Sequence, residues 1–177
     1  MESKAIAIIL EQDHPSPPLY LDSPILKEVE NLLPKILVPL KGVWMPAVPG
    51  ILSEPSAEYF HRTRGESLGK SLEEYAQHSG GEEAWIEALP PIHELGELIK
   101  KESGPYVMGE TREWLSESLE RSSLTACAAS YADFVIVGAL HFFRRIGEVN
   151  FERIVKIEPA YGKLYDACKQ WLERDGH

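Results

Sequence analysis

The chain has 177 residues, of which 44% are hydrophobic and 26% charged, and these values suit one globular domain with a sizeable core. Its net charge of −10 argues against binding to nucleic acid or to an anionic membrane, because both require a basic surface. Two cysteines, Cys127 and Cys168, are too few for a disulfide framework and predict a reducing, cytoplasmic location. The apolar stretch 36–52 is interrupted by a lysine and prolines, which excludes a membrane span there.

The first part of the chain predicts short helices separated by prolines. A helix is expected within residues 1–13, followed by an extended, proline-rich linker over residues 14–22. A second helix should begin after Asp22 or Ser23, with Pro24 at its first position, and Pro34 should kink or end it.

Residues 36–55 are hydrophobic and interrupted by prolines, a composition that predicts the wall of a pocket or contact surface containing Trp44 and Met45. A third helix is expected after Ser56, and it carries two aromatic and two basic residues, Tyr59, Phe60, Arg62 and Arg64. Each aromatic residue has core packing as its alternative interpretation.

Two further helices are predicted before the middle of the chain. Ser71 and Glu74 form a capping-box pattern, in which a hydroxyl and a carboxylate each bind a backbone N–H of the first turn. Residues 82–101 are amphipathic at helical spacing, and the pair Pro90 and Pro91 should bend this helix or split it in two.

The stretch Ser130–Gly147 organises the fold, because it is a long apolar run with clear start and stop signals. Ser130 and Asp133 form a second capping-box pattern, and replacing Asp133 by Ala should cost about 0.5–2 kcal/mol of stability. Two arginines suit the last turn, and Gly147 suits a left-handed C-cap. From Phe134 to Phe143 only His141 is polar, so this helix should lie at the centre of a helical core.

The last part of the chain predicts one amphipathic helix from Tyr161 to Leu172. No segment shows sustained alternation of apolar and polar residues. The predicted fold class is therefore all-α, a helical bundle.

Three apparent catalytic signals have simpler structural explanations. Ser67 matches a nucleophile-elbow pattern, but the residues before it have helical spacing and the motif requires a strand. The histidines show no pair at metal-ligand spacing, so no metal site is predicted. Cys168 lies among apolar residues, where a thiol is inert.

Several segments resemble the glutathione transferase family. The runs GPYVMGET (104–111) and SYADFVIVGALHFFRRIGE (130–148), and a final helix ending QWLER, look like the C-terminal, all-helical half of such an enzyme. The run PSAEYFHRTRGESLGKSLEE (55–74) resembles the fungal etherase-like branch. This resemblance implies that residues 1–13 are the last helix of a thioredoxin-like domain and that residues 23–177 form the helical domain.

The resemblance also implies which chemistry is present and which is missing. Glu2 and Ser3 match a remnant of the motif that holds the γ-glutamyl end of glutathione, whereas the catalytic Ser or Cys and the cis-proline have no counterpart. No catalytic residue and no cofactor are therefore expected, and glutathione would be a co-substrate only if the missing domain were supplied.

Residues 112–128 interrupt a place where members of this family have a short connection. Two interpretations stay open: the codons for these residues can contain the splice signals of an unspliced intron, or the segment is an inserted surface helix. In either case we expect it to be dispensable for the fold.

Two hypotheses of function follow. The first is a glutathione transferase-like protein that acts on or binds a hydrophobic small molecule, in fungal secondary metabolism or detoxification, and that does not conjugate glutathione as this chain. Its predicted pocket residues are Trp44, Met45, Tyr59, Phe60, Arg64 and Tyr131. A homodimer is expected by resemblance. The alternative is a non-catalytic helical binding or interaction module.

Overall fold

A computed structural model describes residues 2–16, 18–109 and 129–172 of the chain, and the side chains of Glu2 and Ser3 lie outside this description. Every regular element in these ranges is a helix, so the all-α prediction is confirmed. The elements are α1 (Glu2–Asp13), α2 (Pro24–Leu37), α3 (Lys41–Ala47), the 3-10 turn η1 (Val48–Ile51), α4 (Glu54–Leu68), α5 (Leu72–Ser79), α6 (Glu82–Lys100), α7 (Tyr131–Ile146), α8 (Glu148–Ile157), α9 (Ala160–Ala167) and α10 (Lys169–Leu172).

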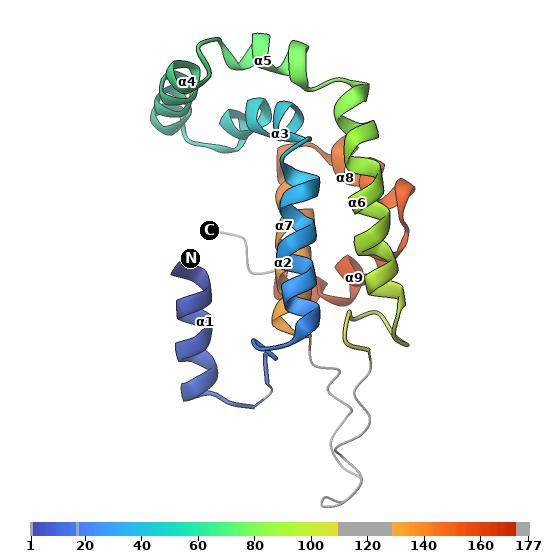
Figure 1. Cartoon of the computed structure of the whole chain (residues 1–177). Coiled ribbons are helices and arrows are strands. Elements are labelled where there is room, and N and C mark those ends of the chain that lie inside the picture. The colour runs from blue at the N-terminus through green and yellow to red at the C-terminus, as the bar shows by residue number, and fades with distance from the viewer. Residues whose placement is uncertain (1, 17, 110–128, 173–177) are drawn as a thin grey trace, which may run out of the picture.

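The core lies between α2, α6, α7 and α9. Helix α2 packs against both α6 and α7, and α8 and α9 each contact both α6 and α7 (Figure 1). Amphipathic spacing explains this arrangement, because each helix places one apolar stripe toward its neighbours. The interior contains the fully or almost fully buried side chains of Leu26, Val29, Ile92, Ile136 and Leu164.

Helices α3, α4 and α5 form a layer across one end of the bundle (Figure 1). Helices α3 and α5 contact each other closely because Gly42 has no side chain. A Cβ atom on Gly42 would lie 2.1 Å from the carbonyl carbon of Ser79, a distance that real Cβ atoms do not reach. Any larger residue at position 42 would therefore separate the two helices.

Helix α1 stands beside the bundle (Figure 1). Its Lys4 pairs with Glu30 of α2 at 3.0 Å, while Ile6 and Ile9 are each 57% exposed. The following segment is anchored to the central helix, because the Leu19 carbonyl accepts the Tyr131 N–H at 2.9 Å. The division into residues 1–13, 14–22 and 23–177 stays a prediction.

Prolines interrupt the helices less than expected. Helix α2 continues past Pro34 to Leu37, and α6 runs unbroken through Pro90 and Pro91. Of the two expected outcomes for α6, a bend or a split, the split is therefore wrong. Pro90 and Pro91 have no N–H to donate to the carbonyls of Ile86 and Glu87, four residues earlier. Because Pro90, Ile86 and Glu87 are exposed, water can replace the lost hydrogen bonds.

Three boundaries also differ from the prediction. Gly147 has φ 169° and ψ 111°, an extended backbone and not the left-handed cap, because α8 starts at the next residue. Helix α4 starts at Glu54, before Ser56. The last predicted helix is divided at Cys168 into α9 and α10. Among the described helices, none combines the length and the apolar character needed to cross a bilayer.

Candidate functional site

The central helix α7 starts at a buried capping box. The Ser130 hydroxyl accepts the Asp133 N–H at 3.4 Å, and the Asp133 carboxylate accepts the Ser130 N–H at 2.7 Å. The same carboxylate accepts the Ser130 hydroxyl at 2.6 Å and the Val107 N–H at 2.8 Å. Asp133 is fully buried, so its role is to fix the start of α7 and to connect it to the segment before residue 110.

One face of α7 is open to solvent, although the sequence predicted burial all around. Gly138, in the middle of the helix, is exposed, and a Cβ atom there would meet no described heavy atom within 4 Å outside its own helix. Phe134 and Phe142 lie four residues before and after it, so they flank it on the same face. We call this strip, Phe134, Gly138 and Phe142, the open face of α7.

An aromatic pair fixes each end of the open face. Phe134 meets Trp171 edge to face with ring centroids 5.3 Å apart, and Phe142 meets Trp44 in the same manner at 5.9 Å. The Trp44 side chain is itself held because its Nε1–H donates to the Leu37 carbonyl at 2.8 Å. The result is a rigid apolar surface with a one-residue gap at Gly138.

The structure distributes the predicted pocket residues over different surroundings. Trp44 borders the open face, and Tyr131 is half-buried in the first turn of α7. Met45 is only 7% exposed and therefore belongs to the interior. Tyr59 is 62% exposed on α4, and on the same helix the Arg64 guanidinium lies 5.2 Å from the Phe60 ring centroid.

Helix α4 itself is unusual in its exposure. None of its 15 residues, all of which the structure describes, is buried. It contacts η1 and α5, the layer at the end of the bundle. Tyr59, Phe60 and Arg64 are therefore placed by a helix outside the core.

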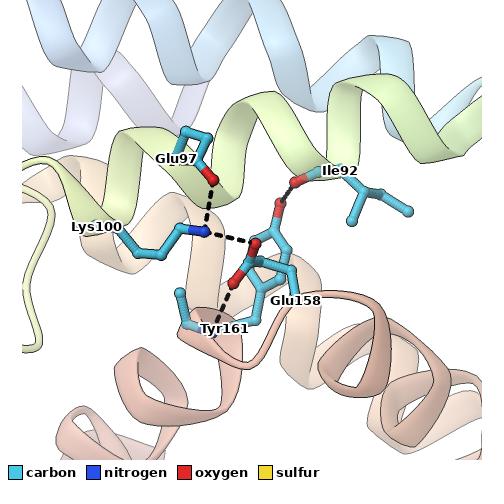
Figure 2. A network of polar contacts seen from close by, with 6 residues as sticks. Ile92, Glu97, Lys100, Glu158 and Tyr161 are labelled. Carbon is cyan, nitrogen blue, oxygen red and sulfur yellow. Dashed lines mark hydrogen bonds and ion pairs between the residues drawn. The ribbon is translucent and has the colours of Figure 1, made fainter.

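A second polar cluster links α6 to the corner between α8 and α9 (Figure 2). Glu158 accepts the Lys100 ammonium at 2.9 Å and the Ala160 N–H at 3.3 Å, and the Tyr161 hydroxyl donates to the Ile92 carbonyl at 2.8 Å. Burial opposes ionisation of Glu158, but these hydrogen bonds outweigh it, and the pKa of Glu158 is lowered. We interpret this cluster as structural.

The cluster requires a glycine on α6. A Cβ atom on Gly96 would lie 2.3 Å from Cγ of Glu158, so the glutamate can approach only because that position has no side chain. Burial raises the pKa of Tyr161, so its phenol stays neutral and acts as a hydrogen-bond donor. Tyr161 lines an apolar cavity of only about 20 Å³, which has room for about one water molecule and not for a substrate.

The residues that resemble catalytic groups in the sequence lie in helices or in the core. Ser67 lies in the last turn of α4, which ends in a left-handed Gly69, so the strand that a nucleophile elbow requires is replaced by a helix. Cys168 is fully buried, and burial raises the pKa of its thiol to about 12. Within the described residues, no three His, Cys, Asp or Glu side chains are grouped to hold a metal ion. The Glu2 and Ser3 side chains and residues 112–128 lie outside the described residues.

Sequence reasoning missed most of the open face. Phe134, Gly138 and Phe142 were absent from the predicted pocket because the apolar run of α7 predicted burial on every side, and Trp171 was absent because it belongs to the apolar face of the last predicted helix. The signal that could have found them is Gly138 itself. A glycine in the middle of a helix weakens the helix, so its presence in a well-capped helix indicates that the position has another purpose.

Residues 29–171 match the family model of the glutathione S-transferase C-terminal domain. The chain therefore belongs to this family. It is 28% identical over 188 aligned residues to a glutathione S-transferase-like protein, ustS, of Aspergillus flavus, and the match covers 99% of this chain and 62% of that protein.

Two solved structures share the fold. Glutathione transferase GSTFuA2 from Phanerochaete chrysosporium has a TM-score of 0.68 at 21% identity, covering 96% of this chain and 63% of that one. A glutathione S-transferase of Ceriporiopsis subvermispora, solved in complex with glutathione, has a TM-score of 0.61 at 22% identity, covering 90% and 65%. The chain thus spans less than two thirds of the length of these relatives.

Proposed function

We propose that this protein is a glutathione transferase-like protein that binds a hydrophobic small molecule on the open face of α7. The observation that carries the proposal is the gap at Gly138 between two fixed aromatic pairs. An apolar ligand that fills this gap would remove aromatic surface from water. The aromatic side chains are already fixed, so they would lose little conformational entropy on binding.

The biological setting belongs to the same proposal. The similar proteins come from fungi, and we place the proposed function in the cytoplasm, in fungal secondary metabolism or detoxification. One of the structural neighbours binds glutathione, and this chain would use glutathione as a co-substrate only together with a thioredoxin-like half. Glu2 and Ser3 are proposed as part of that glutathione site, and a homodimer is proposed as the assembly.

A neutral solvatochromic dye, Nile red, tests the ligand site. The wild-type chain should bind it saturably, and Gly138→Leu should weaken binding at least about tenfold because the new side chain fills the gap. Gly138→Ala is the matched control, since a methyl group fits there and binding should stay within about threefold. Equal binding by wild type and Gly138→Leu would disprove the proposed site.

The second candidate, a non-catalytic interaction module, is supported by α4, whose 15 described residues are all at least partly exposed. A glutathione-affinity column separates the two candidates when the chain is supplied with a thioredoxin-like half. Retention and elution by free glutathione that exceed those of the thioredoxin-like half alone would favour the first, whereas retention no greater than that of this half would favour the second.

A further inference from the structure

A serine preceded by two arginines lies at the end of α4. Arg62 and Arg64 come five and three residues before Ser67, and the apolar Leu68 follows it. Among all the serines and threonines of the chain, Ser67 is the only one with an arginine three residues before it. The helix around Ser67 excludes a nucleophile elbow, so this pattern has no role in the proposed function.

The two arginines and the serine match the pattern that a basophilic protein kinase recognises in a substrate. Such an enzyme binds the chain around the acceptor serine in an extended conformation, and its own carboxylates pair with arginines before that serine. Arg62 and Arg64 are two residues apart, so in an extended chain both side chains project to the same side and can meet one acidic surface. The pattern therefore indicates an acceptor for phosphate at Ser67.

All three side chains are available on the surface of the folded chain. Ser67, Arg62 and Arg64 are exposed, and within the described residues the Ser67 hydroxyl makes no hydrogen bond. The Arg62 guanidinium lies 5.6 Å from the Tyr59 ring centroid, and that of Arg64 lies 5.2 Å from the Phe60 ring centroid. In the described part of the chain neither arginine has a carboxylate partner, so no ion pair competes with the kinase.

The last turn of α4 can open at small cost. None of the 15 residues of α4 is buried, so opening its end removes no side chain from the core. Gly65 lies in this turn, where a glycine weakens the helix, and Gly69 ends the helix in the left-handed conformation. Helix ends with few buried contacts open with the lowest free energies in a folded protein. The segment around Ser67 can therefore become extended while the bundle stays folded.

We propose that Ser67 is a phosphorylation site for a serine/threonine kinase that recognises basic substrates. The Ser67 Oγ forms a bond to the γ-phosphorus of ATP while the bond from that phosphorus to the β,γ-bridging oxygen breaks, and ADP leaves with the electron pair. The hydroxyl proton passes to the catalytic aspartate of the kinase. The product carries about 1.5 to 2 negative charges on the Ser67 side chain. The site lies on α4, so the inference does not depend on the ligand proposed for the open face of α7.

Protein kinase B with Mg²⁺ and γ-labelled ATP tests this site on the folded chain, and tandem mass spectrometry locates the phosphate. The phosphate should be found on Ser67, and Ser67→Ala should lower the initial rate of incorporation at least about tenfold. Ser56→Ala is the matched control and should keep the rate within about twofold, because Ser56 is an exposed serine of the same helix without an arginine in the five residues before it. Unchanged incorporation in Ser67→Ala, or a phosphate mainly on another residue, would overturn the proposal.

A second pair of variants tests the two arginines. Arg62→Gln/Arg64→Gln should lower kcat/KM of the kinase for this chain at least about tenfold, with an unchanged circular dichroism spectrum because both side chains are exposed. Lys156→Gln/Lys163→Gln removes the same charge from exposed residues of α8 and α9 and should stay within about threefold. An equal loss in this control would overturn the proposal, since the kinase would then respond to the overall charge of the chain.

A synthetic peptide of residues 58–72 separates recognition of the residue pattern from the opening of α4. The peptide lacks the rest of the bundle, so it should accept phosphate faster than the folded chain does. Phosphorylation of the peptide alone would show that α4 stays closed in the folded chain and would overturn the proposal. Failure of both substrates would overturn it as well, because the kinase would then not recognise the pattern.

Gly65→Ala tests the opening step in the folded chain. A Cβ atom there would lie 3.6 Å from the Lys70 carbonyl oxygen, an ordinary contact, so alanine should fit and should stabilise the last turn. Phosphorylation of the folded variant should be about two to five times slower, whereas the same change in the peptide should alter the rate less than about twofold. Equal rates for the two folded chains would refute the opening of α4 on which the proposal rests.

Discussion

At the scale of single residues, Asp133 combines a local task with a long-range one. A capping carboxylate normally binds the N-terminus of its own helix, and Asp133 does so through the Ser130 N–H. It also accepts the N–H of Val107, a residue that precedes residues 110–128 in the sequence, whereas Asp133 follows them. Its removal would leave several buried donors without acceptors, a larger loss than that of a helix cap alone.

Asp133→Ala should therefore lower the free energy of unfolding by about 2–4 kcal/mol, more than the 0.5–2 kcal/mol expected for a cap. Glu74→Ala is the matched control, because Glu74 occupies the same position in an exposed capping box with Ser71 and should cost about 1 kcal/mol or less. Urea unfolding midpoints measure both. Equal losses would mean that the bond to Val107 contributes nothing.

Two glycines in helices should respond to alanine with opposite signs. Gly138→Ala should stabilise the protein by about 0.5–1 kcal/mol, because the methyl group meets open space and alanine favours the helix. Gly96→Ala should destabilise it by about 1–3 kcal/mol, because the methyl group would displace the Glu158 side chain. Thermal melting of both variants checks this prediction, which a stabilising Gly96→Ala would contradict.

The ion pair between Glu158 and Lys100 should make stability depend on pH. Because the folded-state pKa of Glu158 lies below its ordinary value of 4.5, its contribution is present above the unfolded pKa and is lost as the pH falls through the folded pKa. The difference in unfolding free energy between wild type and Glu158→Gln should be constant near neutral pH and shrink in the acid range below 4.5.

Urea titrations from about pH 7 to about pH 3 measure that difference. Glu97→Gln is the control, since it removes the other, 72% exposed partner of Lys100 and should change stability much less. A difference for Glu158→Gln that does not vary with pH would refute the role of the ion pair.

At the scale of elements, the chain on both sides of residues 110–128 is tied together by the Asp133 bond to Val107. Val107 is fully buried, so this bond holds the end of the preceding segment against the start of α7. One direct hydrogen bond therefore joins the two flanking elements, and a longer closed loop changes the folding entropy only slowly.

Deleting residues 112–128 together with Ala129→Pro should leave helicity unchanged and should keep or raise the melting temperature. Far-ultraviolet circular dichroism and a thermal melt measure these quantities, with the Ala129→Pro variant of the full chain as control for the proline. The deleted residues lie outside the described part of the chain, and an unfolded or aggregated deletion variant would show that they belong to the core.

At the scale of the whole molecule, the distribution of exposed apolar surface is typical of a domain that packs against a second domain. Ile6, Ile9 and Leu10 of α1 are each more than half exposed, and the open face of α7 is also uncovered in the described structure. The chain spans less than two thirds of its relatives, so these surfaces fit the proposal that the helical domain works together with a thioredoxin-like half.

The 177-residue chain by itself should not conjugate glutathione to a general electrophile such as 1-chloro-2,4-dinitrobenzene, and its affinity for glutathione should be weak. The reason is that the only thiol among the described residues, Cys168, is buried and its raised pKa keeps it neutral, so it offers no activated nucleophile. Turnover above the uncatalysed rate, or micromolar binding by calorimetry, would contradict this prediction.

The sequence by itself determined the features that depend on neighbouring residues. Helical periodicity, the two capping boxes and the helical interpretation of Ser67 all rest on interactions within one or two turns, so residue spacing is sufficient to recognise them. Tertiary structure decided the rest. The burial of Met45, the exposure of Gly138, the approach of Glu158 to Gly96 and the Asp133 bond to Val107 each depend on segments distant in sequence. Side-chain exposure is set by what packs against a helix, and no local pattern contains that information.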